Sequence, residues 1–312
     1  MIMKKVLAVD LGGTKIAVGI IDAQGNVLAK KTAPTPLGDI AATRASIISL
    51  ASEVKKHAGQ VDAIGLALPG IVDRKQGILL RSPSSGWVDV PFAEMIENVF
   101  KLPVMTDNDV NACAWGEYHF GATLKYDSLF WMTISTGIGG ALLIGGKIVE
   151  GASSMAGEIG HLVVNPDGAL CRCGNRGCLE AEAAGPAWRR IALQLLANDQ
   201  SSLLNEVDRN ALDAAAIAEA ARLGDKLGMS IVEHIGNMLS RGLAAIENIL
   251  DPQAIIIGGG VAKSLDLLLP IIRKKLPALT LSALNRNTEI RMSALGYDAA
   301  LIGAASLAFF PY

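Results

Sequence analysis

One pattern constrains this sequence more than any other: an apolar strand, a glycine-rich turn and a second apolar strand, once in each half. Residues 6–21 follow this pattern around Gly12 and Gly13, and residues 129–144 follow it again around the turn 135–140. Returns this short favour antiparallel neighbouring strands. The repetition indicates two halves built on similar α/β architecture.

The segments between these patterns alternate between strand and helix signals. Residues 40–56 place Ile47, Ile48, Leu50 and Val54 on one helical face. The other expected elements are strands at 27–29, 63–70, 102–106 and 254–257, helices at 92–99, 111–117, 211–250 and 299–309, and a structured loop region at 151–177. The alternation predicts a mixed α/β fold.

The composition is that of a folded protein. Hydrophobic residues make up 51% of the 312 residues and charged residues 19%, which excludes an intrinsically disordered chain. The net charge is −2, from 28 Lys and Arg against 30 Asp and Glu, so overall charge gives no reason to expect nucleic acid as a partner. The sequence also lacks an apolar run of the roughly 18 residues that a membrane helix needs, and a signal-peptide apolar region. We expect a cytoplasmic protein with no nucleic-acid or membrane partner.

The glycine-rich turns are candidates for binding phosphate. Glycine lets backbone N–H groups approach an anion, and Thr14 and Lys15 add a hydroxyl and a cation. A strand follows Lys15, which excludes a phosphate-binding loop that opens a helix, and the glycine spacing excludes the dinucleotide fingerprint. Taken alone, the turn 12–15 is explained equally well as an ordinary hairpin. Three such turns, at 12–15, 135–140 and 258–260, favour a nucleotide held between two similar halves.

Three of the four cysteines lie in one short segment. Cys171, Cys173 and Cys178, together with His161, offer three thiolates and one imidazole, a common tetrahedral zinc set. A Cys-x-Cys disulfide would be badly strained, so the spacing favours zinc over unligated reduced thiols. Cys113 stands apart from this group and is expected to be buried packing.

These motifs together resemble the ROK family of sugar kinases, a group named for repressors, open reading frames and kinases. The resemblance covers nearly the whole chain and is carried by the segments 7–15, 108–111, 135–140, 157–161 and 171–180. It implies an α/β, two-domain actin-like ATPase fold (hexokinase- and ribonuclease H-like) with an interdomain cleft, and a homodimer.

The expected domains follow from the same resemblance. A small α/β domain is expected at 1–107, joined by the C-terminal helix at 297–312. A large α/β domain that carries the zinc-binding loop is expected at 108–296.

The resemblance implies an ATP-dependent sugar kinase that phosphorylates a hexose at the 6-hydroxyl, as a glucokinase does. Its implied cofactors are Mg-ATP and a structural zinc ion. Asp109 is the implied base for the sugar hydroxyl, and Asp10 orients Mg²⁺ through water. A helix cap, which Asp107 or Asn108 could equally supply, is the alternative reading of this segment.

The other implied site residues fall into three groups. The ATP-binding residues are Asp10, Gly12, Gly13, Thr14, Lys15, Thr136, Gly137, Gly139, Gly258, Gly259 and Gly260. The substrate-binding residues are Gly70, Asn108, Asp109, Glu158, His161 and Glu180. The metal ligands are His161, Cys171, Cys173 and Cys178, with one nitrogen of His161 on zinc and the other towards the sugar.

Two departures from the family pattern bear on the substrate. Ser84 stands where many glucose-type members carry Asn, and Glu182 stands where an aromatic residue is common. The preferred sugar therefore stays open, with N-acetylmannosamine or N-acetylglucosamine as the alternative to glucose, and so does polyphosphate as the alternative donor. A sugar-sensing transcriptional regulator of the same family is disfavoured, because a DNA-binding domain would be expected before Asp10.

Overall fold

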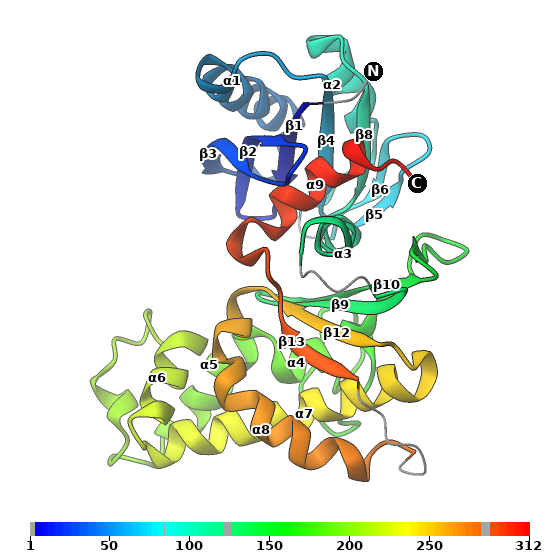
Figure 1. Ribbon diagram of the computed structural model, residues 1–312. Coiled ribbons are helices and arrows are strands. Elements are labelled where there is room, and N and C mark those ends of the chain that lie inside the picture. The colour runs from blue at the N-terminus through cyan, green and yellow to red at the C-terminus, as the bar shows by residue number, and fades with distance from the viewer. Residues whose placement is uncertain (1–3, 84, 122–125, 282–287) are drawn as a thin grey trace. The chain divides into compact units, whose positions relative to one another are not determined.

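A computed structural model describes residues 4–83, 85–121, 126–281 and 288–312 (Figure 1). The chain divides into two units. The first comprises Met1–Tyr126, Leu142–Ala156 and Ser293–Tyr312, and the second comprises Asp127–Ala141 and Gly157–Met292. The domain boundary expected between residues 107 and 108 stays a prediction.

The first unit contains a five-stranded sheet with the order β3-β2-β1-β4-β8. Its strands are β1 (Lys5–Leu11), β2 (Lys15–Asp22), β3 (Val27–Pro34), β4 (Ala63–Leu68) and β8 (Val104–Asn108). The first three pair in antiparallel fashion, which confirms the predicted meander. Strands β4 and β8 continue the sheet in parallel with β1. Every residue of β4 is buried, which accounts for its continuous apolar run.

Three helices of the first unit are α1 (Ile40–Ala58), α3 (Asp109–Phe120) and α9 (Ala299–Phe309). Helix α1 buries Ile47, Leu50 and Val54 of the predicted face, whereas Ile48 is only half-buried. Helix α9 packs against α3, β1 and β4. The approach to β4 is so close that a Cβ on Gly65 would overlap the backbone of α9. Glycine at this position therefore sets how closely α9 covers the sheet.

The first unit also holds a small element group that the sequence did not predict. It is a three-stranded sheet of β5 (Ile71–Asp73), β6 (Ile78–Arg81) and β7 (Val88–Val90), paired in antiparallel fashion and followed by α2 (Phe92–Phe100). These strands are too short for an alternating pattern to stand out in the sequence. Helix α2 matches the helix expected at 92–99.

A second five-stranded sheet has the order β11-β10-β9-β12-β13. Its strands are β9 (Ser128–Ile134), β10 (Ile138–Ile144), β11 (Lys147–Ile148), β12 (Ala254–Gly258) and β13 (Glu289–Met292). Strand β12 runs parallel to both β9 and β13. Strands β9, β12 and β13 belong to the second unit.

The helices of the second unit are α4 (Leu179–Ala183), α5 (Gly185–Leu196), α6 (Ala214–Arg222), α7 (Lys226–Leu250) and α8 (Leu265–Lys275). Short 3₁₀ helices are η1 (Ile159–His161), η2 (Leu203–Glu206), η3 (Gly260–Ser264), η4 (Leu276–Ala278) and, in the first unit, η5 (Gly296–Asp298). The helix predicted over 211–250 is two helices. Gly224 breaks it with φ of 86°, and the Asp225 side chain caps α7 by accepting the Gly228 N–H at 2.7 Å.

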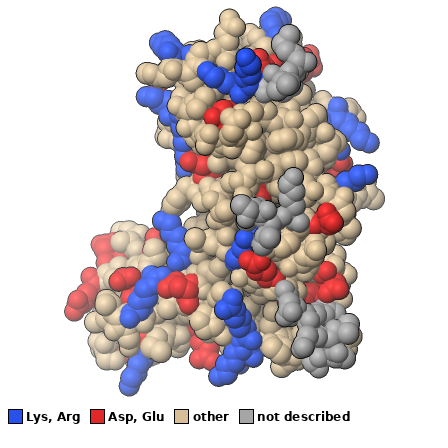
Figure 2. Space-filling view, viewed as in Figure 1, with Lys and Arg blue, Asp and Glu red and all other residues tan. Residues whose placement is uncertain are grey.

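The surface carries both signs of charge. On the face that Figure 2 shows, Lys and Arg side chains lie among Asp and Glu side chains, and neither sign fills one continuous area. Within the described ranges, none of the helices has both the length and the apolar character required to pass through a bilayer.

Candidate active site and metal cluster

One edge of the first sheet gathers the site residues predicted in the first unit. In the strand register, Asp10 of β1 pairs with Ala67 of β4, and Ala67 pairs with Asp107 of β8. Because the three strands are parallel, their carboxyl ends meet at the same edge, where α/β sheets bind ligands. Asn108 and Asp109 follow directly after this row.

Asn108 fixes the start of helix α3. Its Oδ1 accepts the N–H groups of Val110 at 2.8 Å and Asn111 at 3.2 Å, so Asn108 supplies the helix cap that the sequence left open. Its Nδ2 donates to the carbonyl oxygen of Gly70 at 2.9 Å and to Oδ1 of Asp109 at 3.0 Å. Asn108 therefore holds Gly70 and Asp109 in a fixed relation.

Asp109 and Asp10 have carboxyl groups that ionise less readily than usual. Burial, and after it the negative charge of Asp10, raises the pKa of Asp109 to about 7. Burial also raises the pKa of Asp10 to about 6, although the charges of Lys15 and Lys30 lower it. A carboxylate whose pKa lies near neutral pH is suited to accept a proton.

The turn 12–15 is a braced hairpin between β1 and β2. The Gly12 N–H donates to the Lys15 carbonyl at 3.0 Å, and a Cβ on Gly12 would lie 2.9 Å from the same oxygen. Thr35 holds the turn from outside, because its Oγ1 donates to the Gly12 carbonyl at 2.7 Å and its N–H donates to the Thr14 carbonyl at 3.0 Å. The Thr14 and Lys15 side chains are exposed and free to meet a ligand. Sequence reasoning missed Thr35, which carries no motif signal.

In the second unit, the turns 135–140 and 258–260 lie at the ends of adjacent parallel strands. Gly258 of β12 pairs with Thr133 of β9. Gly259 has φ of 88°, and a Cβ there would overlap the carbonyl of Ile134. These two of the three predicted nucleotide turns are thus neighbours. Glycine is required at position 259, because its backbone conformation and its surroundings both exclude a side chain.

Glu180 lies beside the first of these turns. Its Oε2 accepts the Ile138 N–H at 2.9 Å, and a Cβ on Gly137 would lie 2.5 Å from that oxygen. A cavity of about 370 Å³ has both Thr136 and Glu180 in its wall, together with Arg190. A residue predicted for the sugar and a turn predicted for ATP therefore line one cavity.

The segment 157–161 lies against β10. A Cβ on Gly157 would overlap the carbonyl of Gly140, and one on Gly160 would overlap the carbonyl of Ile138. This close approach ends in η1, where the Nε2 of His161 lies 3.8 Å from Oε2 of Glu158. The two predicted sugar ligands of this segment are therefore next to each other.

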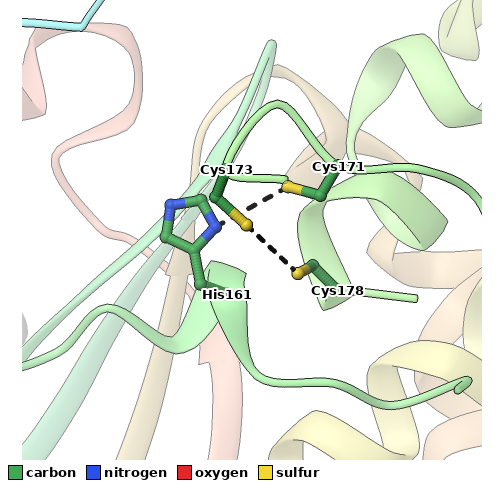
Figure 3. A group of neighbouring side chains, drawn as sticks. All are labelled: His161, Cys171, Cys173 and Cys178. Atoms are coloured by element: carbon green, nitrogen blue, oxygen red, sulfur yellow. Dashed lines mark hydrogen bonds between the residues drawn. The ribbon is translucent and has the colours of Figure 1, made fainter. Parts of the chain in front are cut away.

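The four predicted metal ligands converge, as Figure 3 shows. Their ligand atoms all lie within 4.8 Å of one another. The Cys171 Sγ is 3.7 Å from Nδ1 of His161, and the Cys173 Sγ is 3.6 Å from the Cys178 Sγ. Zn–S bonds of about 2.3 Å in a tetrahedron put sulfur ligands about 3.7 Å apart, so the donor set fits zinc.

The two nitrogens of His161 face different partners. Nδ1 faces the cysteine sulfurs, and Nε2 faces Glu158. Nδ1 is therefore the nitrogen that could bind a metal, and the role of Nε2 towards the sugar stays a prediction. Among the thiols, the Asn175 N–H lowers the pKa of Cys173 to about 7, whereas burial raises the pKa of Cys178 to about 12.

Glu182 supports the loop that carries the cysteines. Its side chain is buried, and its carboxylate accepts the Ala169 N–H at 2.6 Å and the Asn165 Nδ2–H at 3.4 Å. The Nε2 of His234 in α7 lies 3.5 Å away. Glu182, at a position where an aromatic residue is common in the family, thus stabilises this loop through hydrogen bonds. Ser84, the other departure, lies outside the described residues.

The ROK family model matches residues 6–309 of the sequence. The chain belongs to the ROK family. Its relatives include the glucokinase of Streptomyces coelicolor, 35% identical over 311 residues that cover 98% of each chain. The N-acetylmannosamine kinase of Escherichia fergusonii is 33% identical over 307 residues that cover 97% of each chain.

A solved structure extends the similarity of this ROK chain to three dimensions. The ROK family glucokinase from Streptomyces griseus, in complex with glucose and AMPPNP, aligns with a TM-score of 0.86 and 35% identity, over 98% of both chains. The predicted two-domain actin-like α/β fold is thereby confirmed.

Proposed function

We propose that this ROK protein is an ATP-dependent hexose kinase of the glucokinase type that transfers a phosphoryl group to the sugar 6-hydroxyl. The observation that carries the proposal is the position of Asp109. It starts α3 at the carboxyl edge of the sheet, its pKa is raised to about 7, and Asn108 holds its carboxylate. The glucokinases of both Streptomyces species, at 35% identity, support the same reaction.

The proposed base works by accepting one proton. Ionised Asp109 takes the proton of the sugar hydroxyl as that oxygen attacks the terminal phosphorus of ATP, and the bond from this phosphorus to the bridging oxygen of ADP breaks. The Asn108 amide keeps the accepting carboxylate in place. A carboxylate that is hard to ionise is a stronger base once ionised, which suits it to an alcohol proton.

The phosphates of ATP are assigned to two sets of residues in glycine turns. Gly12, Gly13, Thr14 and Lys15 offer N–H groups, a hydroxyl and a cation, and Thr136, Gly137 and Gly139 offer a second set. Gly258, Gly259 and Gly260 are proposed for the adenosine. Mg²⁺, when bound with ATP, neutralises phosphate charge, and Asp10 is the carboxylate proposed to orient it.

The sugar is assigned to Gly70, Asn108, Asp109, Glu158, His161 and Glu180. Carboxylates accept two hydrogen bonds or more, and an imidazole can donate or accept, so this set can match ring hydroxyls that both donate and accept. The close packing of Gly157 and Gly160 on β10 supports the placement of Glu158 and His161.

We assign His161, Cys171, Cys173 and Cys178 to a structural zinc ion. The four protein ligands would fill the four coordination positions of a tetrahedral zinc ion and leave none for an activated water. The chemistry that zinc would supply is cross-linking of the loop. His161 would then be held by Nδ1 and present Nε2 beside Glu158 to the sugar. A homodimer, which the family resemblance implies, and a cytoplasmic location, which the sequence composition led us to expect, complete the proposal.

A panel of sugars tests the proposed function. ADP release is measured with Mg-ATP and glucose, mannose, fructose, N-acetylglucosamine or N-acetylmannosamine, and again with polyphosphate by sugar-phosphate formation. We expect the highest kcat/KM with ATP and glucose. A higher kcat/KM with N-acetylmannosamine would instead assign the chain to the activity of its Escherichia relative. No turnover with any hexose or amino sugar would refute the proposal.

A further inference from the structure

Asp107 is a buried carboxylate that the proposed reaction does not use. Only 3% of its surface is exposed, and it precedes Asn108 and Asp109 at the end of β8. Its Oδ1 accepts the backbone N–H of Asn108 at 2.6 Å and the side-chain amide of Asn111 at 3.0 Å. Asp107 therefore fixes both the backbone before Asp109 and a side chain one turn into α3.

The second oxygen of Asp107 depends on a residue far away in the sequence. The hydroxyl of Tyr312 donates to Oδ2 of Asp107. This hydrogen bond favours the ionised form of the Asp107 carboxyl, whose pKa burial raises.

Tyr312 is itself held on two sides. Its ring centroid lies 4.4 Å from that of Trp115 in α3, and the guanidinium carbon of Arg74 lies 4.2 Å above the ring. Arg74 also donates to the backbone carbonyl of Tyr312, and its Nε bonds Oε1 of Glu150 at 2.6 Å. The phenol hydroxyl is therefore placed by ring packing and by a cation that is anchored on another residue of the same unit.

These contacts form one path to the proposed base. Tyr312 holds Asp107, Asp107 holds the backbone of Asn108, and the Asn108 amide holds the carboxylate of Asp109. Removal of one partner from a buried charge is costly, because the remaining group keeps its desolvation penalty. Loss of the hydrogen bond from Tyr312 to Asp107 would therefore shift the turn between β8 and α3.

We propose that Tyr312 is a positioning residue for phosphoryl transfer, acting through Asp107 to align the carboxylate of Asp109. The inference rests on the proposed function of Asp109 and adds a residue that contacts neither sugar nor nucleotide in the proposal. The proposed role belongs to the phenol hydroxyl of Tyr312 and not to its aromatic ring.

The test removes that hydroxyl alone. In Tyr312→Phe we expect kcat to fall about tenfold with the KM for the sugar within about twofold, because misalignment of a base affects the reacting geometry more than binding. Tyr118→Phe is the matched control, since Tyr118 also stacks on Trp115, with ring centroids 5.6 Å apart. The control is expected to keep the kcat of the unmodified protein.

A double-mutant cycle tests the route through Asp107. Asp107→Asn should also lower kcat, and Tyr312→Phe should add less than about a twofold loss in that background, because the two changes break the same link. An equal loss from Tyr312→Phe in both backgrounds, or a kcat within twofold of the unmodified protein for either single variant, would overturn the inference. Asp109→Asn is measured alongside: if it retains turnover, the proposed base is wrong, whereas its inactivation with a fully active Tyr312→Phe removes only the role of Tyr312.

Discussion

The proposed site residues of the two units are held by different kinds of structure. In the first unit, Asp10 lies one residue before the end of β1, which runs parallel to β4, and Asp109 begins a helix that Asn108 caps. In the second, Glu158 and His161 lie in a loop whose regular structure is one three-residue 3₁₀ helix. Backbone hydrogen bonds of a sheet position the first group, whereas glycine packing and the Cys/His cluster position the second.

Exposure separates Glu158 and His161 from Asp109. The side chains of His161 and Glu158 are 40% and 51% exposed, whereas burial is the main cause of the raised pKa of Asp109. A half-buried carboxylate on a rigid edge is suited to proton transfer, and exposed groups on a loop are suited to binding. The comparison predicts that changes in the first unit alter kcat and that changes in the second alter the KM for the sugar.

The largest effect is expected from Asp109→Asn. The amide cannot accept the hydroxyl proton, so kcat should fall by about 10²- to 10⁴-fold, while sugar affinity stays within about tenfold. Steady-state kinetics and sugar titration measure the two quantities. Asp39→Asn is the control, because Asp39 caps the exposed start of α1 as Asn108 caps α3. An Asp109→Asn protein with more than a tenth of normal kcat would remove the contrast between the units.

The pH dependence of kcat/KM is the next largest effect. Asp109 must be ionised to act and its pKa is about 7, so activity is present above this value and lost as the pH falls through it. The expected slope is about tenfold per pH unit, or about 100-fold at pH 5. Circular dichroism at each pH checks that the protein stays folded. A flat profile from pH 8 to pH 5 in folded protein would contradict the assignment.

Removal of the metal should affect the second unit and therefore the KM for the sugar. Chelation, or Cys178→Ser, is expected to raise the KM for the sugar about tenfold and to lower the Tm, with a smaller change in kcat. Elemental analysis gives the zinc content, and added zinc should restore the chelated protein. Cys113→Ala removes a thiol outside the cluster and should leave both zinc and KM unchanged. If kcat changed as much as the KM for the sugar, the loop that carries the cysteines would contribute to the reaction step as well as to sugar binding.

The smallest effect is expected from the buried support beneath the loop. Glu182→Leu leaves the Ala169 N–H without its acceptor, which should reduce the free energy of unfolding by about 2 kcal/mol. Glu182→Gln keeps an acceptor oxygen and should lose less. Denaturant unfolding measures both, and zinc release rates show whether the loop loosens. If Glu182→Leu is as stable as the unmodified protein, Glu182 does not brace the loop.

Much of the architecture was accessible from local pattern. The meander of β1 to β3, the face of α1 and the convergence of His161 with three cysteines follow from spacing, because period and ligand separation are properties of neighbouring residues. The break at Gly224 was missed, since apolar residues at helical spacing occur on both sides of it. The small sheet of β5 to β7 was missed because its strands are too short to show a period.

The sequence by itself determined which chemical groups are available: a carboxylate after a capping Asn, glycine turns that can approach phosphate, and a zinc-type donor set. Only the tertiary structure decided the surroundings that tune and hold them. Three features depend on residues from different segments. They are the raised pKa of Asp109, the hydrogen bond from Ala169 to Glu182 and the hydrogen bond from Tyr312 to Asp107. Burial and long-range hydrogen bonds depend on how those segments pack, and no local pattern encodes that.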